Sequence, residues 1–238
     1  MKTILVINAK GGCGKTTLTT NLASYYASRG LKVAIMDYDP QGSSINWTRL
    51  RSSMLPSIHI ANGAPAKGGT QLRGIQTYVP SSTDVLIVDP PAGASGLLLQ
   101  DLVRKSDFIL VPVAPSSIDI HATAGFVRDL LLTGGARRLN IKVGVVANKV
   151  RKSMPVYEPL ERFLKSLDLP MLARISDSDH YLTAVEGGLG VFEMQDAEVA
   201  PQRQEFMPVI EWMGIAQARA EQIDKNVFSL PGFRRSVL

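Results

Sequence analysis

The chain has 238 residues, of which 45% are hydrophobic, and its formal net charge is +5 at pH 7. A chain of this length and composition can bury a large core, so it fits one α/β domain. Its single cysteine excludes a disulfide framework and favours a reducing, cytoplasmic setting. No apolar run approaches the roughly 20 residues that span a bilayer. Because the predicted first strand lies at the N-terminus, a signal peptide is not expected.

Segments typical of strands and helices alternate along the chain. Short, largely apolar runs predict strands at 3–7, 32–37, 57–61, 85–89, 108–113, 142–148 and 169–175. Apolar residues at three- and four-residue spacing predict a first helix that includes 18–26 and further helices at 45–51, 70–79, 95–104, 117–133, 156–167, 178–187 and 201–221. Strands that are apolar on both faces and separated by helices predict a mostly parallel, twisted sheet covered by helices on both faces. We expect one domain over residues 1–222, followed by a tail at 223–238.

A glycine-rich loop lies between the first predicted strand and the first predicted helix. Its glycines let backbone N–H groups turn inward around an anion, and the helix N-terminus adds partial positive charge. Lys15 would reach the β- and γ-phosphates of a nucleotide, and the Thr16 hydroxyl would bind Mg²⁺. The residues that we expect to bind ATP in this loop are Lys10, Gly11, Gly12, Cys13, Gly14, Lys15, Thr16 and Thr17.

The loop departs from the general phosphate-loop pattern in two places. Ala9 stands where that pattern has a glycine, and Lys10 is a second lysine where ordinary loops of this kind have none. Two ammonium groups near one loop repel each other unless a polyphosphate neutralises them. We therefore expect Lys10 to point at phosphate, in its own subunit or in a partner's.

Three acidic residues follow predicted strands. Asp37 and Asp39 come after the second strand, and Asp89 ends the fourth. Ligands of such sheets bind beyond the carboxyl ends of the strands, and Mg²⁺ prefers a few oxygen ligands together with water. A single acid at this position is often only a helix or turn cap. Together with Thr16, the three acids predict a site for a nucleotide and Mg²⁺.

Residues 10–17, Lys-Gly-Gly-Cys-Gly-Lys-Thr-Thr, resemble the deviant Walker A loop of the ParA/MinD family of dimerising ATPases, and most of all the small ParF-like partition ATPases. The resemblance implies a phosphate-loop NTPase fold. It also implies that Lys10 reaches across a two-fold interface to the nucleotide of the partner subunit, so that ATP holds a homodimer together. Hydrolysis then loosens that dimer.

The resemblance extends to the acidic residues. The segment 37–42, Asp-Tyr-Asp-Pro-Gln-Gly, resembles the first switch of the family, in which the acids orient the attacking water and hold a metal-bound water. Asp39 is the first candidate for activating the water and Asp37 the second. The resemblance gives Thr16, Asp39 and Asp89 as the metal site. The segment 89–91, Asp-Pro-Pro, resembles the second switch, although the family pattern has one more residue after the aspartate.

Two later segments complete the expected site. Asn148 follows a strand and resembles the adenine-side residue of the family, with 174–177 on the opposite edge, where Ile175 and Asp177 would contact ATP. An asparagine at a strand end is otherwise a common turn residue. Residues 112–119 resemble a proline-containing stretch near the family's dimer interface. They also fit an ordinary strand-to-helix turn with a serine N-cap.

The positive charge is concentrated in one segment. Residues 137–165 carry eight lysines and arginines against two glutamates, a net charge of +6, and the rest of the chain sums to −1. Such a segment suits contacts with DNA phosphates, which require charge but no base recognition. A solvated helix face is the alternative. The DNA-binding candidates are Arg137, Arg138, Lys149, Arg151, Lys152, Arg203 and Arg219.

By this resemblance the protein is expected to be a slow ATPase. Its ATP-bound dimer would bind nucleoid DNA non-specifically, and a cargo adaptor protein would stimulate hydrolysis. The chain starts at its first strand, so an N-terminal helix-turn-helix domain and operator recognition are not expected. The alternative is a MinD-like switch on the membrane surface. That role needs an amphipathic C-terminal helix, which Pro231-Gly232 would interrupt, so membrane binding is not expected.

Overall fold

The computed structural model describes residues 1–64, 78–151, 158–166, 168–195 and 197–217. Seven strands form one sheet in the order β3-β2-β4-β1-β5-β6-β7, and every strand pair is parallel. The strands are β1 (Lys2–Val6), β2 (Val33–Asp37), β3 (Ile58–Asn62), β4 (Val85–Asp89), β5 (Phe108–Val113), β6 (Lys142–Val150) and β7 (Met171–Ser176). The predicted parallel sheet is confirmed.

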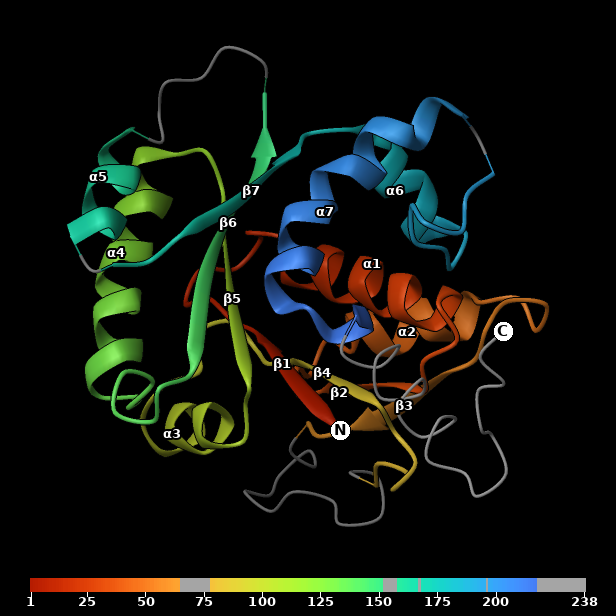
Figure 1. Cartoon of the computed structure of the whole chain (residues 1–238), viewed down its shortest axis with the longest axis horizontal. Coiled ribbons are helices and arrows are strands. Elements are labelled where there is room, and N and C mark those ends of the chain that lie inside the picture. The colour runs from red at the N-terminus through yellow and green to blue at the C-terminus, as the bar shows by residue number, and fades with distance from the viewer. Residues whose placement is uncertain (65–77, 152–157, 167, 196, 218–238) are drawn as a thin grey trace, which may run out of the picture.

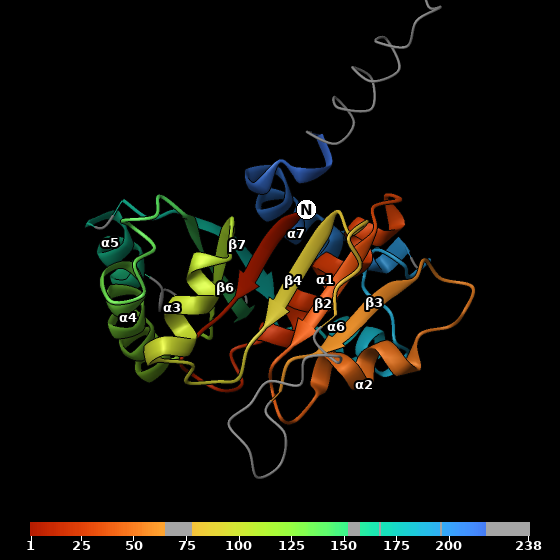
Figure 2. The same cartoon turned by 90° about the horizontal axis from the view of Figure 1, so that it is seen from below.

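Helices cover both faces of the sheet, as Figures 1 and 2 show. The helices are α1 (Lys15–Ser28), α2 (Ser43–Leu50), α3 (Gly96–Arg104), α4 (Ser117–Leu132), α5 (Glu158–Ser166), α6 (Asp179–Glu186) and α7 (Ala200–Met213). One core cluster joins the sheet to α1, α2, α6 and α7 and includes Tyr26, Trp47 and Phe206. The other joins the opposite face to α3, α4 and α5. Every residue of β2 and β5 is buried because these central strands are covered on both sides.

The helix ends follow local sequence signals, with one difference from the prediction. Ser116 accepts a hydrogen bond from the Asp119 N–H and is the N-cap of α4, as the serine-cap interpretation predicts. The predicted last helix, 201–221, is interrupted: α7 ends at Met213, residues 215–217 are helical again, and 218–221 lie outside the described residues. Gly214 follows Met213 with φ of 63°, the left-handed conformation that terminates helices. The apolar residues Phe206, Val209, Ile210 and Met213 of α7 are buried, as their three- and four-residue spacing predicts.

Some predictions lie outside the described residues. They are most of the helix at 70–79, the first residues of the helix at 156–167, Lys152, Arg219 and the tail at 223–238. The domain boundary at residue 222 therefore stays a prediction. Among the described residues, no helix combines the length and the apolar character needed to cross a bilayer.

Candidate nucleotide-binding site

The loop between β1 and α1 has the backbone geometry of an anion site. Gly12 and Gly14 adopt φ of 76° and 92°, which side-chain-bearing residues rarely adopt. Gly14 is the N-cap of α1 and makes no side-chain capping bond, so the first N–H groups of α1 face the loop without a side-chain acceptor. Lys15 starts the helix and is only 8% exposed. The glycines, the helix N-terminus and a nearly buried lysine fit a bound phosphate chain.

The Asn148 side chain forms a hydrogen bond with the backbone of this loop. Its Nδ2 donates to the Cys13 carbonyl at 2.8 Å, and the side chain is buried. The contact depends on Gly14, because a Cβ there would lie 1.8 Å from Asn148 Nδ2. A register shift between Ala147 and Val150, with Lys149 at φ of 57°, breaks the regular alternation of β6 at this point. Asn148 thus has a role that the sequence did not predict, and its adenine contact stays a prediction.

Asp89 lies beside the start of α1, and one of its carboxylate oxygens accepts hydrogen bonds from two hydroxyl groups. Thr16 Oγ1 donates to Asp89 Oδ2 at 3.1 Å, and Ser44 Oγ donates to the same atom at 2.6 Å. Asp89 is 2% exposed, and burial raises its pKa to about 6. The negative charge of neighbouring Asp37 contributes to this rise, whereas the two hydrogen bonds and the positive charge of Lys15 reduce it. The structure thus brings Thr16 and Asp89 together, as the metal-site prediction requires.

The two acids of the first switch have different surroundings. Asp37 is fully buried, and its two oxygens accept the N–H groups of Asp39 at 2.9 Å and Ile45 at 3.2 Å. Burial raises the Asp37 pKa. These hydrogen bonds fit the alternative interpretation of a strand-end acid as a helix or turn cap, since Ile45 lies in the first turn of α2. Asp39 is half-buried, and its Oδ1 accepts the Gln41 N–H at 2.9 Å. Asp39 is therefore the better placed of the two to act on a water molecule, and both catalytic roles stay predictions.

Lys10 does not share the environment of Lys15. Its side chain is 49% exposed, and its Nζ lies 3.9 Å from Oδ1 of Asp119 at the start of α4. The other Asp119 oxygen, Oδ2, accepts the Ser116 hydroxyl at 2.6 Å. Asn8 contacts the backbone of Lys10, since its Oδ1 accepts the Lys10 N–H at 3.4 Å while its Nδ2 donates to the Pro112 carbonyl at 2.7 Å. Lys10 is thus held over α4.

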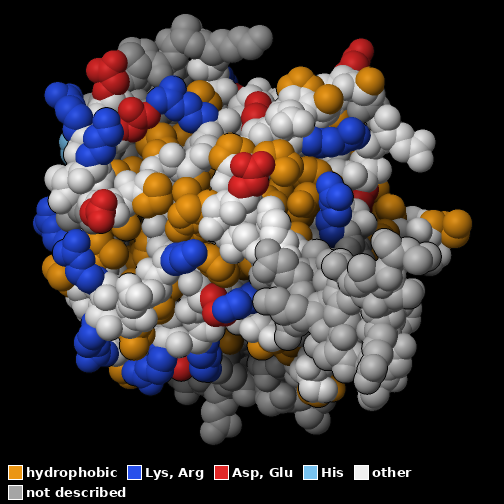
Figure 3. Space-filling view, viewed as in Figure 1, with side chains coloured by type: hydrophobic (Ala, Val, Ile, Leu, Met, Phe, Trp, Pro, Cys, Tyr) orange, Lys and Arg blue, Asp and Glu red, His pale blue; other side chains and the backbone are white. Residues whose placement is uncertain are grey.

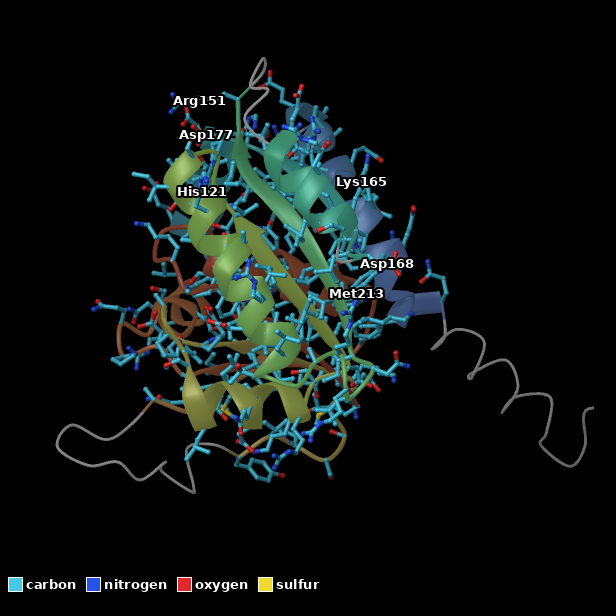
Figure 4. All side chains as sticks on the ribbon, turned by 90° about the vertical axis from the view of Figure 1, so that its left-hand side faces the viewer. His121, Arg151, Lys165, Asp168, Asp177 and Met213 are labelled. Atoms are coloured by element: carbon cyan, nitrogen blue, oxygen red, sulfur yellow. The ribbon has the colours of Figure 1, made fainter. Side chains whose placement is uncertain are left out.

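The ends of β6 and β7 form the edge that is expected to contact the adenine base. The Asp177 N–H donates to the Val150 carbonyl at 3.0 Å, and Arg151 Nε donates to Asp177 Oδ2 at 3.0 Å. Figure 4 shows Arg151 and Asp177 next to each other at this end of the sheet. Ile175 is fully buried in the core, so only its backbone is available to a ligand. Contacts of Ile175 and Asp177 with ATP stay predictions.

The structure divides the predicted DNA surface. Arg137 and Arg138 lie before β6, whereas Lys149 and Arg151 lie at its far end, about 30 Å away for a nine-residue strand. Figure 3 shows blue side chains spread along the side that carries α4 and α5, with red ones between them. Arg203 is half-buried, and its guanidinium donates to the carbonyls of Val191 and Met194. Its contact with DNA, like those of the other candidates, stays a prediction.

Sequence reasoning missed two polar residues of the site. Ser44 is fully buried against Asp89, and Asp119 is the counter-ion of Lys10. A hydroxyl residue in the first helical turn after 37–42 was a weak signal for Ser44. Within the described residues no group of three or more His, Cys, Asp or Glu could hold a metal.

Comparisons with known proteins agree with this geometry. Residues 4–191 match the family model described as the CobQ/CobB/MinD/ParA nucleotide binding domain. The chain is 28% identical over 199 residues to the maintenance of carboxysome distribution protein A of Halothiobacillus neapolitanus, covering 81% of this chain and 87% of that protein.

Two solved structures share the fold. A putative plasmid partition protein from Borrelia burgdorferi bound to AMPPNP has a TM-score of 0.64 at 15% identity, covering 88% of this chain and 98% of its own. The septum site-determining protein MinD of Pyrococcus horikoshii, complexed with Mg-ADP, has a TM-score of 0.61 at 17% identity, covering 99% of both chains. The predicted family and fold are thus confirmed, and the chain belongs to the CobQ/CobB/MinD/ParA nucleotide-binding family.

Proposed function

We propose that this protein is an ATP-operated switch that dimerises around ATP and separates after slow hydrolysis. The observation that carries the proposal is the different placement of two lysines in one loop. Lys15 is nearly buried at the start of α1, where it would bind its own nucleotide. Lys10 is half exposed over α4, where it would be free to reach the nucleotide of a second copy.

The residues of the site divide the chemistry between them. Thr16 and Asp89 would hold Mg²⁺, which supplies positive charge beside the phosphates. Lys15 and the N–H groups of the loop would bind and orient the phosphate chain. Asp39 would orient the attacking water, and Lys10 of the other copy would stabilise charge that develops in the transition state.

Loss of the γ-phosphate offers a physical reason for the switch. The ammonium group of Lys10 would be attracted to the second copy mainly by phosphate charge. Hydrolysis removes part of that charge, so the preference of Lys10 for the partner over Asp119 decreases. The dimer would then dissociate.

The dimer would act as a positioning device on DNA, with an adaptor protein that stimulates hydrolysis. Two observations support this part of the proposal. The side of the molecule with α4 and α5 carries exposed lysines and arginines, which suit non-specific phosphate contacts. The relatives include proteins named for carboxysome distribution and plasmid partition.

The dimer is tested by light scattering with ATP and Mg²⁺ over a range of protein concentrations. Hydrolysis is blocked by Asp39→Ala, which we expect to trap the dimer. Adding Lys10→Ala should weaken dimerisation at least about tenfold, since the variant loses a charge-assisted contact to phosphate. Lys32→Ala, which removes an exposed lysine at the start of β2, is the control. A protein that stays monomeric at every concentration contradicts the proposal.

The surface on which the switch acts is tested by co-sedimentation with DNA and with anionic liposomes, in ADP and in ATP. We expect ATP-dependent sedimentation with DNA alone. Reversing charge at Arg137 and Arg138, or separately at Arg151, distinguishes the two ends of β6. The end that contacts DNA should show weaker binding and a smaller dependence on salt. Sedimentation with liposomes instead would favour the membrane-surface alternative.

A further inference from the structure

Glu205, in the second turn of α7, accepts three hydrogen bonds on one carboxylate oxygen. Its Oε2 accepts the Ser176 N–H at 2.9 Å, the Ser176 hydroxyl at 3.1 Å and the Tyr181 hydroxyl at 2.7 Å. Burial and the charge of Glu205 raise the pKa of Tyr181, so its phenol stays protonated and donates. One carboxylate therefore fastens α7 to the end of β7 and to α6.

The two residues after Ser176 are fixed by other partners. The Asp177 N–H donates to Val150 at the end of β6, and the Asp177 carboxylate accepts from Arg151. Ser178 accepts a hydrogen bond from Gln202 Nε2 of α7 at 3.3 Å. Residues 176–178 are thus held on one side by α7 and on the other by β6.

This segment is connected to the phosphate loop through β6. Val150 contacts Asp177, and Asn148, two residues earlier, donates to Cys13 in the loop. The segment also lies beyond the carboxyl ends of the strands, where ligands of parallel sheets bind. In Figure 1, α7 runs alongside β7 and α6 at this part of the molecule. We therefore expect the nucleoside part of a nucleotide bound in the phosphate loop to reach this segment.

We propose that Glu205 is a positioning residue for nucleotide binding, which holds residues 176–178 as the edge against which the base packs. The inference rests on the proposed function, because it requires a nucleotide in the phosphate loop. The phosphate chain would bind to loop residues that Glu205 does not touch. Loss of Glu205 should therefore weaken only the part of the affinity that comes from the base.

The test compares the binding of ATP and of inorganic tripolyphosphate, each with Mg²⁺, by isothermal titration calorimetry. Glu205→Ala should weaken ATP binding about tenfold, the value of one strong hydrogen bond, and change tripolyphosphate binding less than about twofold. Glu205→Gln should recover most of the affinity, because its amide oxygen can still accept from Ser176 and Tyr181. Glu211→Ala removes an exposed glutamate of the same helix and should change the binding of neither ligand.

Each outcome supports or overturns the proposal. Unchanged ATP affinity in a folded Glu205→Ala variant, or an equal loss for both ligands, would overturn it. If Glu205→Ala does not fold, Tyr181→Phe decides, since it removes one of the three donors. It should weaken ATP binding about twofold to threefold without affecting tripolyphosphate. Wild-type protein that binds neither ligand would overturn the proposed function together with this inference, whereas the other negative results leave the function standing.

Discussion

Two buried carboxylates, Glu193 and Asp89, have opposite electrostatic surroundings. Glu193 forms two hydrogen bonds with Arg51, at 2.6 and 2.9 Å, and the side chains of the pair are 3% and 5% exposed. The Arg51 guanidinium also lies 4.7 Å from the centre of the Trp47 ring. Asp89 is equally buried, but its bound donors are the neutral hydroxyls of Thr16 and Ser44. The chain neutralises the first charge with Arg51, and we propose that a bound Mg²⁺ neutralises the second.

On this proposal, the difference separates a structural acid, Glu193, from a functional one, Asp89. The Arg51–Glu193 pair joins the end of α2 to the loop after α6, so it anchors the helix that follows the first switch. Asp89 lies at the other end of α2, beside Ser44. Lys15 is near enough to Asp89 to lower its pKa, but burial outweighs that attraction. A buried acid that is not fully compensated costs stability, and such groups are often found at functional sites.

The largest expected effect comes from removing the neutralising partner of the structural acid. Arg51→Ala leaves Glu193 buried and unpaired and should lower the free energy of unfolding by about 3–5 kcal/mol. Urea denaturation followed by circular dichroism measures it. Arg49→Ala, on the exposed side of the same helix, is the matched control and should cost less than about 0.5 kcal/mol. A loss of stability for Arg51→Ala no larger than that of the control would mean that the pair contributes nothing.

Removing the charge of the functional acid, Asp89, should raise the stability of the nucleotide-free protein, whereas Arg51→Ala lowers it. The Asp89 pKa is about 6 in the folded chain against 3.8 for the free group, so the folded state binds the proton more tightly. Stability without nucleotide should therefore fall as the pH rises from about 4 to about 6, by at most about 3 kcal/mol. Asp89→Asn should abolish this fall and stabilise the nucleotide-free protein at pH 7 by about 1–3 kcal/mol.

The same variant should lose Mg²⁺-dependent ATP binding, since a neutral amide is a poor ligand for Mg²⁺. Urea denaturation at several pH values, with and without Mg²⁺ and ATP, measures both effects. A destabilised Asp89→Asn variant at pH 7 would show that the carboxylate is a structural group like Glu193.

The same comparison shows what the sequence could predict. Local patterns were sufficient for the strands, the phosphate loop and the position of Asp89, because each depends on neighbouring residues in the chain. Contacts between distant segments were not predicted. Asn148 reaches Cys13 beside a register shift in β6, and the contact requires that Gly14 has no Cβ. The contact of Glu205 with Ser176 depends on how α7 packs beside β7, for which an amphipathic pattern specifies a buried face and no partner.

The smallest expected effect concerns Ser44. Removing its hydroxyl tests whether this hydrogen bond favours the ionised form of Asp89. The Ser44 hydroxyl donates to Asp89 at 2.6 Å and lowers its pKa, so Ser44→Ala should raise that pKa further above 6. The pH range over which stability falls should extend to higher pH, because only the pKa of the folded state rises. Mg²⁺-dependent ATP binding should weaken by about 1 kcal/mol at pH 6.5. Ser44→Thr keeps the hydroxyl and should restore most of both effects. Ser43→Ala, one residue earlier and exposed, is the control. If Ser44→Ala left the pH range unchanged, its hydroxyl would only fill space, because a donor to the carboxylate must move the proton equilibrium.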